Sequence, residues 1–525
     1  MGLVMFALAL VLIMLTGVPV YAVLIGVSSI FAALGLALGL FDTALLGAVP
    51  SRLVGLLEHD LLQTLPLYAL VGAMLNRLPL AQQLHAAGMR LFRRSAASAE
   101  LAALGVGALL APMNGSVGAS LHMLSRSVAP ALEGRCSPAQ AGATVCVAST
   151  LGIAIAPSLV LLLLGDAMMR AHTEAQNVTH TMLRIVNTQD VMRAALVPAA
   201  LVLLSAMAIA AWRGLRRAQA DLSATQTNAH ASSQTIAHTS PQIARQVSLQ
   251  VSPPMRTEAG LHEASASYAL PLSTWLAACT TALVIVLLLA GVAVGRLYAV
   301  EAAATGCVLL FAYALLSGQL RAALMSQVLR DSMALTGVLM ALLVAATTFS
   351  LVLRAYGTDA LIAQALQAWS GRPMAMLLIV FSGLVACSFV LDAFEMIFLV
   401  IPLVMPPLLM TVPDPAWVAA LTLLVLQLGF LLPPFGYAVL MSRSLLHPAP
   451  NPGLLARALV PHLLAQAVLI VAVLSWPQMT RWTRPDPPAA TAGNTPEQAE
   501  RLLQQAIEAQ QNERVADTKP DPTGR

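Results

Sequence analysis

The sequence predicts an all-α membrane protein that crosses the bilayer many times. Hydrophobic residues make up 58% of the 525-residue chain and charged residues only 10%, whereas soluble globular proteins carry about 25% charged residues. Runs such as 196–211 and 276–294 are free or nearly free of charge, and a helix needs about 20 apolar residues to cross a bilayer. A Leu-Gly-x-x-x-(Ala/Pro)-Pro sequence interrupts two apolar runs far apart in the chain. This repetition favours a polytopic transporter built from two pseudo-symmetric inverted repeats.

The apolar segments fall into two sets, which predict a first membrane half over 1–212 and a second over 271–476. Residues 1–16 lack the basic start and the cleavage site of a signal peptide, and the apolar run continues to Leu40, so we interpret them as the first span. The segments of the first half lie near 3–16, 20–40, 62–76, 140–165 and 191–212, and those of the second near 274–295, 298–316, 374–391, 396–412, 415–441 and 457–476.

Polar sequence separates the two halves and follows the second one. Residues 213–270 are rich in Ser, Thr, Ala and Gln, which is typical of a flexible linker, and their arginine-rich start favours a cytoplasmic position. Residues 477–525 have the composition of a soluble tail. Within it, Thr495, Pro496 and Gln498 form a capping pattern that predicts a short amphipathic helix, either on the surface or against a partner protein.

Residues 99–130 do not fit a simple span, because their two apolar arms of about a dozen residues are each too short to cross the bilayer. The arms meet at Pro112, Asn114 and Gly115, which break a helix. The sequence therefore predicts a re-entrant helical hairpin. Backbone at that depth must be buried in protein or line a water-filled cavity.

A second hairpin is expected at about 332–356, in the corresponding place of the second half. Its centre carries Thr347 and Thr348, and no glycine or proline marks the turn. The expectation rests on position alone, because this segment precedes the second interrupted run as the first hairpin precedes the first.

Each half also contains a broken helix, at about 140–165 and at about 415–441. One such break on its own is typical of a kinked packing helix. Two breaks of the same sequence, each preceded by an expected hairpin, indicate the binding site of a transporter. The residues at the breaks are Gly152 and Pro157 in the first run and Gly429, Pro433 and Pro434 in the second.

The broken helices supply oxygen ligands for a cation. Unwound backbone frees carbonyl groups, which are costly to bury without a partner and which a bound Na⁺ can take up. Ser and Thr hydroxyls add neutral oxygens, and the N-termini of half-helices attract an anionic substrate. The predicted substrate and ion region contains Asn114, Gly115, Ser116, Ser149, Thr150, Gly152, Pro157, Thr347, Thr348, Gly429, Pro433 and Pro434, with Ser116, Ser149, Thr347, Thr348 and Gly429 as Na⁺ ligands.

Two acids in apolar context, Asp392 and Glu395, have two interpretations. An acid inside the membrane is a functional candidate, here for coupling to an ion. The Asp-x-x-Glu spacing also matches a capping box, which would make both residues a helix start.

The remaining features give no support to several other classes of protein. The five cysteines show no CxxC or metal-ligand spacing, and no HExxH or GxSxG motif indicates a membrane-embedded enzyme. The net charge of +4 gives no support for nucleic-acid binding.

The motifs, taken in order, resemble those of the large membrane subunit of TRAP transporters, the tripartite ATP-independent periplasmic transporters. The resemblance covers about 1–212 and 271–476. Single motifs are weak, but their order across two halves is specific. They are "LTGVPVYAVLIGV", "LLQTLPLYALVGAMLNRLPLAQQL", "MNGSVGAS", "STLGIAIAPS", "VEAAATG", "FVLDAFEMIFLVIPLVMP" and "LGFLLPPFGYAVLM".

The resemblance implies an elevator-type secondary transporter of the bacterial inner membrane, in which Na⁺ drives the uptake of an organic acid. It also implies two partners, a small four-helix membrane subunit, expected as a separate chain, and a periplasmic solute-binding protein. Two alternatives stay open: an ion-coupled carrier that works without a binding protein, and a membrane-embedded enzyme.

Overall fold

The computed structural model describes most of the chain, and every statement about structure below concerns these residues. They are 1–42, 44–57, 60–114, 116–179, 186–237, 272–367, 371–412 and 414–482. Within them the regular elements are all helical. Seven helices are long and apolar enough to cross a membrane, or eight if one bent pair is counted as a single span. The predicted all-α polytopic fold is confirmed.

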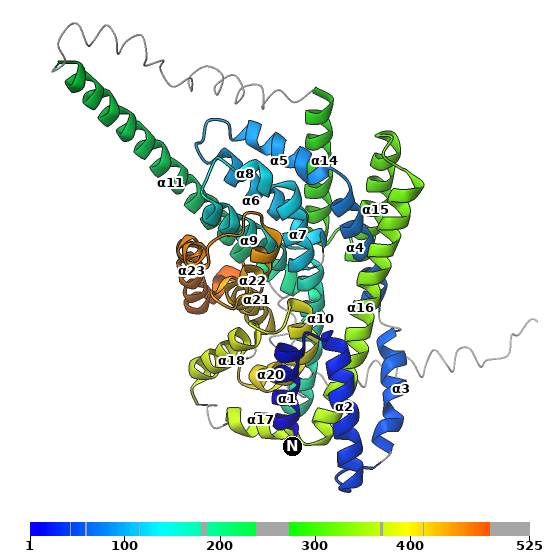
Figure 1. The fold of residues 1–525 in the computed structure, drawn as a ribbon. Coiled ribbons are helices and arrows are strands. Elements are labelled where there is room, and N and C mark those ends of the chain that lie inside the picture. The colour runs from blue at the N-terminus through cyan, green and yellow to red at the C-terminus, as the bar shows by residue number, and fades with distance from the viewer. Residues whose placement is uncertain are drawn as a thin grey trace, which may run out of the picture. The chain divides into compact units, whose positions relative to one another are not determined.

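One group of helices comes from the starts of both halves of the chain. α16 packs along α2 and α4, α15 packs on α4, and α14 packs on α15. Figure 1 shows α15, α16, α2 and α3 along one side of the described molecule. The bounds are α1 Gly2–Thr16, α2 Val20–Ala37, α3 Ala44–Leu57, α4 Asp60–Arg77, α14 Leu272–Val294, α15 Ala299–Leu316 and α16 Ala322–Ala355.

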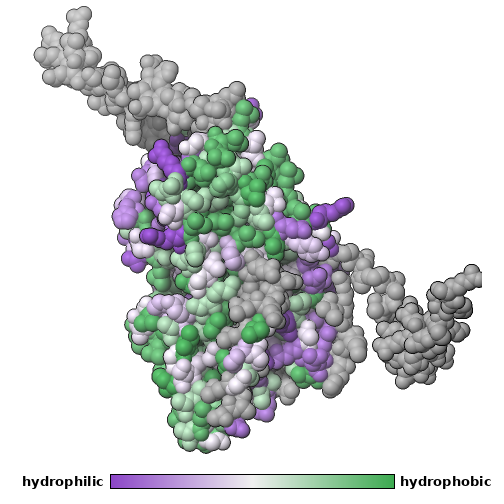
Figure 2. Space-filling view, turned by 90° about the vertical axis from the view of Figure 1, so that its right-hand side faces the viewer, coloured by the Kyte–Doolittle hydropathy of each residue, from purple (hydrophilic) through white to green (hydrophobic). Residues whose placement is uncertain are grey.

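The outer face of this group is apolar. Val308 and Leu316 on α15 are 68% and 88% exposed, and Figure 2 shows hydrophobic residues over much of this side. A large exposed apolar face is typical of contact with lipid or with another membrane protein.

The first half also forms a hairpin and a broken helix. The hairpin (hairpin 1) runs from α6 through a 3₁₀ turn into α7, whose first turn is capped because Ser116 Oγ accepts from Ala119 N at 3.2 Å. The broken helix is α9 followed by α10, bent by 41°. The bounds are α5 Leu80–Leu91, α6 Ser98–Leu110, η1 Ala111–Asn114, α7 Val117–Ser127, α8 Ala129–Leu132, α9 Pro138–Ala154 and α10 Leu159–Thr179.

The second half contains the same two parts, but the predicted hairpin at 332–356 is wrong. That segment lies inside α16, which is one continuous helix of 34 residues. The hydroxyls of Thr347 and Thr348 donate to the carbonyls of Leu343 and Val344 at 2.8 and 2.9 Å. The two hydroxyls therefore form their hydrogen bonds with backbone carbonyls one turn earlier in the same helix. Because the segment has no glycine or proline at this point, nothing breaks the helix.

The second hairpin (hairpin 2) is formed by α18 and α20, which pack on each other and are joined through 388–400. Figure 1 shows α18 and α20 at the end of the molecule opposite to α5 and α6, so the two hairpins open in opposite directions. The broken helix behind it is α21 and α22. The bounds are α17 Thr358–Gln367, α18 Pro373–Cys387, α19 Ala393–Glu395, a π turn Met396–Val400, α20 Ile401–Thr411, α21 Pro415–Leu431, α22 Tyr437–Leu445, α23 Pro452–Ser475 and η3 Pro477–Thr480.

The linker prediction for 213–270 is wrong in its first part. α11 spans Thr188–Ala237 and so continues far beyond the apolar run, because Ala, Gln, Leu and Arg there favour a helix. Residues 238–271 lie outside the described part of the chain. The predicted tail helix near Thr495 also lies outside it.

Candidate functional site

The tip of hairpin 1 touches the break in the first broken helix. A Cβ added at Gly152 would lie 2.6 Å from both the carbonyl carbon and the oxygen of Ala111, the residue that follows α6. Real Cβ atoms do not approach backbone so closely, so only glycine fits here. Gly152 thus lets the tip of the hairpin lie directly on the last turn of α9.

The second half repeats this contact. A Cβ added at Gly429 would lie 2.0 Å from the Oγ and 2.9 Å from the Cβ of Ser388, the residue that follows α18. Ala111 and Ser388 therefore occupy the same place in the two hairpins, as Gly152 and Gly429 do in the two broken helices. The sequence does not reveal this correspondence, because Ser388 lies outside the segment predicted to form the second hairpin.

A cavity of about 10 Å³ lies at the first contact. This is close to the space that one water molecule needs. Ser116 of the hairpin and Ser149 and Gly152 of the broken helix, three of the residues predicted for the ion region, line it. Its walls also contain Ser120 and Ser158, which sequence reasoning missed. The position of Ser120 one turn after the cap of α7, and of Ser158 directly after Pro157, could have pointed to them.

The other described residues predicted for the first half, Asn114, Thr150 and Pro157, do not line this cavity. Asn114 is 1% exposed, its amide donates weakly to Ser120 Oγ at 3.4 Å, and its Oδ1 is buried without a partner. The Thr150 hydroxyl donates to the carbonyl of Val147 at 2.9 Å. Pro157 lies in the break between α9 and α10. Gly115 lies outside the described residues.

The second site is built around the start of the outgoing arm of hairpin 2. Asp392 stands before α19, where Ser116 stands before α7. Its backbone N donates to the Glu395 carboxylate at 2.9 Å, which is one arm of the predicted capping box. Asp392 Oδ1 is buried and has no partner. The pair therefore forms the capping box that one of the two interpretations expects.

The break of the second broken helix faces the same tip. Pro433 and Pro434 lie between α21 and α22, and the ring centroid of the adjacent Phe435 is 6.3 Å from that of Phe389 in the tip. Cys146 Sγ in α9 contacts the carbonyl of Ala438 in α22 at 3.5 Å. The two broken helices therefore pack against each other and place both sites in one unit.

Thr347 lies in a different cavity from the one at Gly152. It lines a space of about 500 Å³ between α10, α16 and α20, together with Arg170 and Arg354. The size is in the range of sites for small organic ligands. Arg354 pairs with Glu174 at 2.9 Å, so an ion pair joins α16 to α10 across this cavity.

Residues 7–479 match the family described as "Tripartite ATP-independent periplasmic transporter, DctM component". The match covers both hairpins and both broken helices. The chain belongs to this family. The protein is therefore the large membrane permease of a tripartite transporter, a class that is not enzymatic, and it crosses the membrane several times.

Two further comparisons concern the fold of the permease. It is similar to the crystal structure of the YdaH transporter of Alcanivorax borkumensis, whose topology is described as unusual. The TM-score is 0.50 and the sequence identity 17%, over 85% of this chain and 91% of that one. At this identity the likeness shows the fold alone. Comparison with curated proteins gave no match.

Proposed function

We propose that this permease imports an organic anion, a carboxylate, across the bacterial inner membrane and that Na⁺ drives the import. The anion arrives on a periplasmic solute-binding protein, and a separate small four-helix subunit completes the membrane part. The observation that carries the proposal is the cavity of about 10 Å³ at the tip of hairpin 1, which four serines line.

The lining of this cavity fits a single small hard cation. Hard cations prefer oxygen ligands, and a serine hydroxyl that donates one hydrogen bond keeps lone pairs to accept a cation. The Ser149 hydroxyl donates to the carbonyl of Cys146 at 2.8 Å, which leaves its oxygen free in this way. Ser116 and Ser158 add hydroxyls from the hairpin and the break. Among the described residues no group of His, Cys, Asp and Glu favours a transition metal instead.

The corresponding cation site of the second half contains Asp392 and Ser388 beside Gly429. It replaces Thr347 and Thr348, whose place in an ion site depended on a hairpin that the structure does not contain. The partnerless, buried Oδ1 of Asp392 supports this assignment. A carboxylate at this tip and a serine at the other would make the two sites unequal.

The anionic substrate is expected at the starts of the half-helices. α10 and α22 both begin directly after a break, at Leu159 and Tyr437. A helix N-terminus carries a partial positive charge, which stabilises a carboxylate without a charged side chain.

The test is uptake into proteoliposomes that contain the permease and its small subunit, with the binding protein outside and an inward Na⁺ gradient. Ser149→Ala should raise the Na⁺ concentration needed for half-maximal uptake about tenfold, because one hydrogen-bonding ligand is worth about 1.4 kcal/mol. Thr144→Ala is the matched control. Thr144 is on the same helix, its hydroxyl donates to the carbonyl of Gln140 at 2.9 Å, and it does not line the cavity.

Two outcomes would contradict the proposal. Uptake that is unchanged when Na⁺ is replaced by K⁺ would show that Na⁺ does not drive transport through the proposed ion sites. Uptake at the full rate without binding protein would favour the stand-alone carrier.

A further inference from the structure

Two cavities lie beside each other at the base of hairpin 1. The larger, of about 650 Å³, is an apolar crevice between α5, α6, α11 and α14, with Val106, Leu109 and Met207 among its walls. The smaller, of about 400 Å³, lies at the turn from α5 to α6. Arg93 lines both, so the cavities meet at this residue.

The smaller cavity is cationic. Arg93, Arg135 and Arg217 line it, against one acid, Glu100. Arg90 adds a further positive charge at the edge of the apolar crevice. Arg90 and Arg93 have no acidic partner within the described part of the chain. Because one carboxylate faces several guanidinium groups, the cavity attracts an anion.

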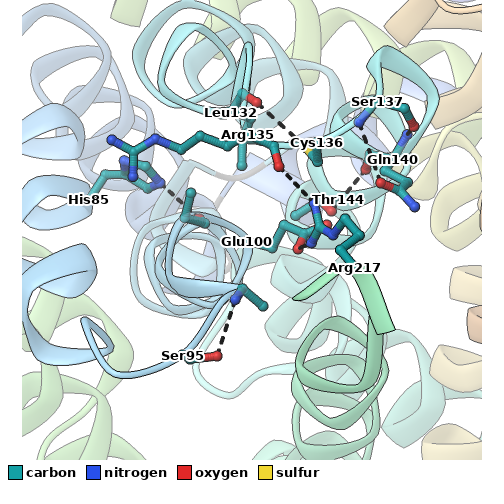
Figure 3. Close-up of polar contacts among 12 residues, drawn as sticks. His85, Ser95, Glu100, Leu132, Arg135, Cys136, Ser137, Gln140, Thr144 and Arg217 are labelled. Atoms are coloured by element: carbon teal, nitrogen blue, oxygen red, sulfur yellow. Dashed lines mark hydrogen bonds and ion pairs between the residues drawn. The ribbon is translucent and has the colours of Figure 1, made fainter. Parts of the chain in front are cut away.

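Polar atoms of this cavity are buried without partners. Figure 3 shows Glu100 and Arg217 pointing toward each other, and Arg217 also donating to the carbonyl of Arg135. Glu100 is 2% exposed, yet its Oε1 has no hydrogen-bond partner, and neither does Arg217 Nε. A phosphate bound here would accept from Arg217, and its ordered water or a headgroup hydroxyl would donate to Glu100.

Residues typical of a membrane interface lie at and near these cavities. Trp275 lines the apolar crevice, and Arg216 stacks at 4.2 Å over the ring of Trp212. Tryptophan is enriched where hydrocarbon meets the headgroups, and arginines just beyond an apolar span contact anionic lipids.

We propose that an anionic phospholipid binds here, with its phosphate on Arg90, Arg93 and Arg217 and an acyl chain in the apolar crevice. The inference does not depend on the substrate or the coupling ion. A free anion would leave the crevice empty. A helix of another membrane protein would fill the crevice but leave the arginines without counter-charge. The bound lipid would join α5 and α6 of the first half to α14 of the second.

The test is native mass spectrometry of the permease with its small subunit, delipidated in detergent and titrated with dioleoylphosphatidylglycerol. Arg93→Gln should weaken binding about fivefold, the contribution of one arginine at an anionic surface. Gly105→Leu should weaken it as much, because this residue lines the crevice and a Cβ added there meets no atom within 4 Å. The new side chain fills the crevice without disturbing the fold.

The matched controls are Arg321→Gln and Gly337→Leu, which remove a charge and add the same side chain outside both cavities. Both should bind the lipid as the wild type does. Equal weakening in the controls would overturn the proposal. So would displacement of the lipid by inorganic phosphate alone, or loss of the small subunit from Gly105→Leu with lipid binding unchanged.

Discussion

Gly152 and Gly429 allow each hairpin tip to lie on its broken helix, but they differ in what they touch. Gly152 faces the backbone of Ala111, whereas Gly429 faces a side chain, that of Ser388. A side chain can be removed by mutation and a backbone cannot. The two contacts therefore have the same geometry, but only the one at Gly429 can be relieved by a second substitution.

Replacing either glycine by alanine should destabilise the permease. Gly152→Ala and Gly429→Ala should each cost about 1–3 kcal/mol, as overpacking does. Ser388→Gly should restore most of the stability of Gly429→Ala, because it removes the atoms that clash. Thermal unfolding in detergent measures the effect.

The control for both substitutions is Gly383→Ala on α18, where an added Cβ meets no atom within 4 Å. Its stability should change by less than about 0.5 kcal/mol. If Gly429→Ala matched this control, the close contact with Ser388 would be wrong.

Single elements are held by polar groups as well as by apolar packing. α11 is the clearest case, because Arg217 pairs with Glu100 of α6 and Arg213 donates to the carbonyl of Ala458 in α23. These contacts lie beyond the apolar part of the helix. They explain how a segment expected to be a linker keeps its helical structure against the base of hairpin 1.

Removing one partner of the Glu100–Arg217 pair should be worse than removing both. Arg217→Met should cost about 3 kcal/mol, because it leaves a carboxylate that is 2% exposed without its counter-charge. Adding Glu100→Met should recover most of that loss. A double-mutant cycle on thermal unfolding measures the coupling.

The control for this cycle is Arg170→Met, since Arg170 pairs with Asp166 on the same helix and is 48% exposed. An exposed pair of this kind contributes about 0.5 kcal/mol. Strictly additive losses for Glu100 and Arg217 would contradict the buried pair.

At the scale of the whole molecule, two helix groups are connected by few ion pairs. α10 packs on α20 and carries the first break, while α16 packs on α2 and α4. Arg354 of α16 and Glu174 of α10 form an ion pair across the large cavity between them. An elevator movement of the hairpins and broken helices would have to separate this pair.

Linking α10 to α16 should therefore stop transport. A reducible thiol cross-linker on Glu174→Cys/Arg354→Cys, with the exposed Cys279 replaced by alanine, should abolish uptake, and reductant should restore it. The matched control is Arg77→Cys/Asp331→Cys, which replaces a 2.7 Å pair between α4 and α16 within the other group. Cross-linking of the control should leave uptake intact. Full uptake by the linked Glu174/Arg354 pair would argue against the elevator.

The sequence by itself determined the class of the protein, its family and the position of the first helix break. The length and apolar content of each segment can be read from the sequence. A bilayer requires an apolar segment of that length to form a helix, because its backbone groups have no water to bond with. Gly152 and Pro157 mark the break in the sequence, because glycine and proline act locally on the backbone. Broken helices could be recognised for the same reason.

Only the tertiary structure decided which segment forms hairpin 2 and which residues meet at the breaks. Thr347 and Thr348 are typical of a polar turn, but their hydroxyls donate to backbone carbonyls of their own helix. Composition therefore does not distinguish the tip of a hairpin from a continuous helix. Nothing in the sequence around Ser388 distinguishes it from other serines in apolar segments. Its role comes from lying against Gly429, a contact between residues 41 positions apart that packing alone brings together.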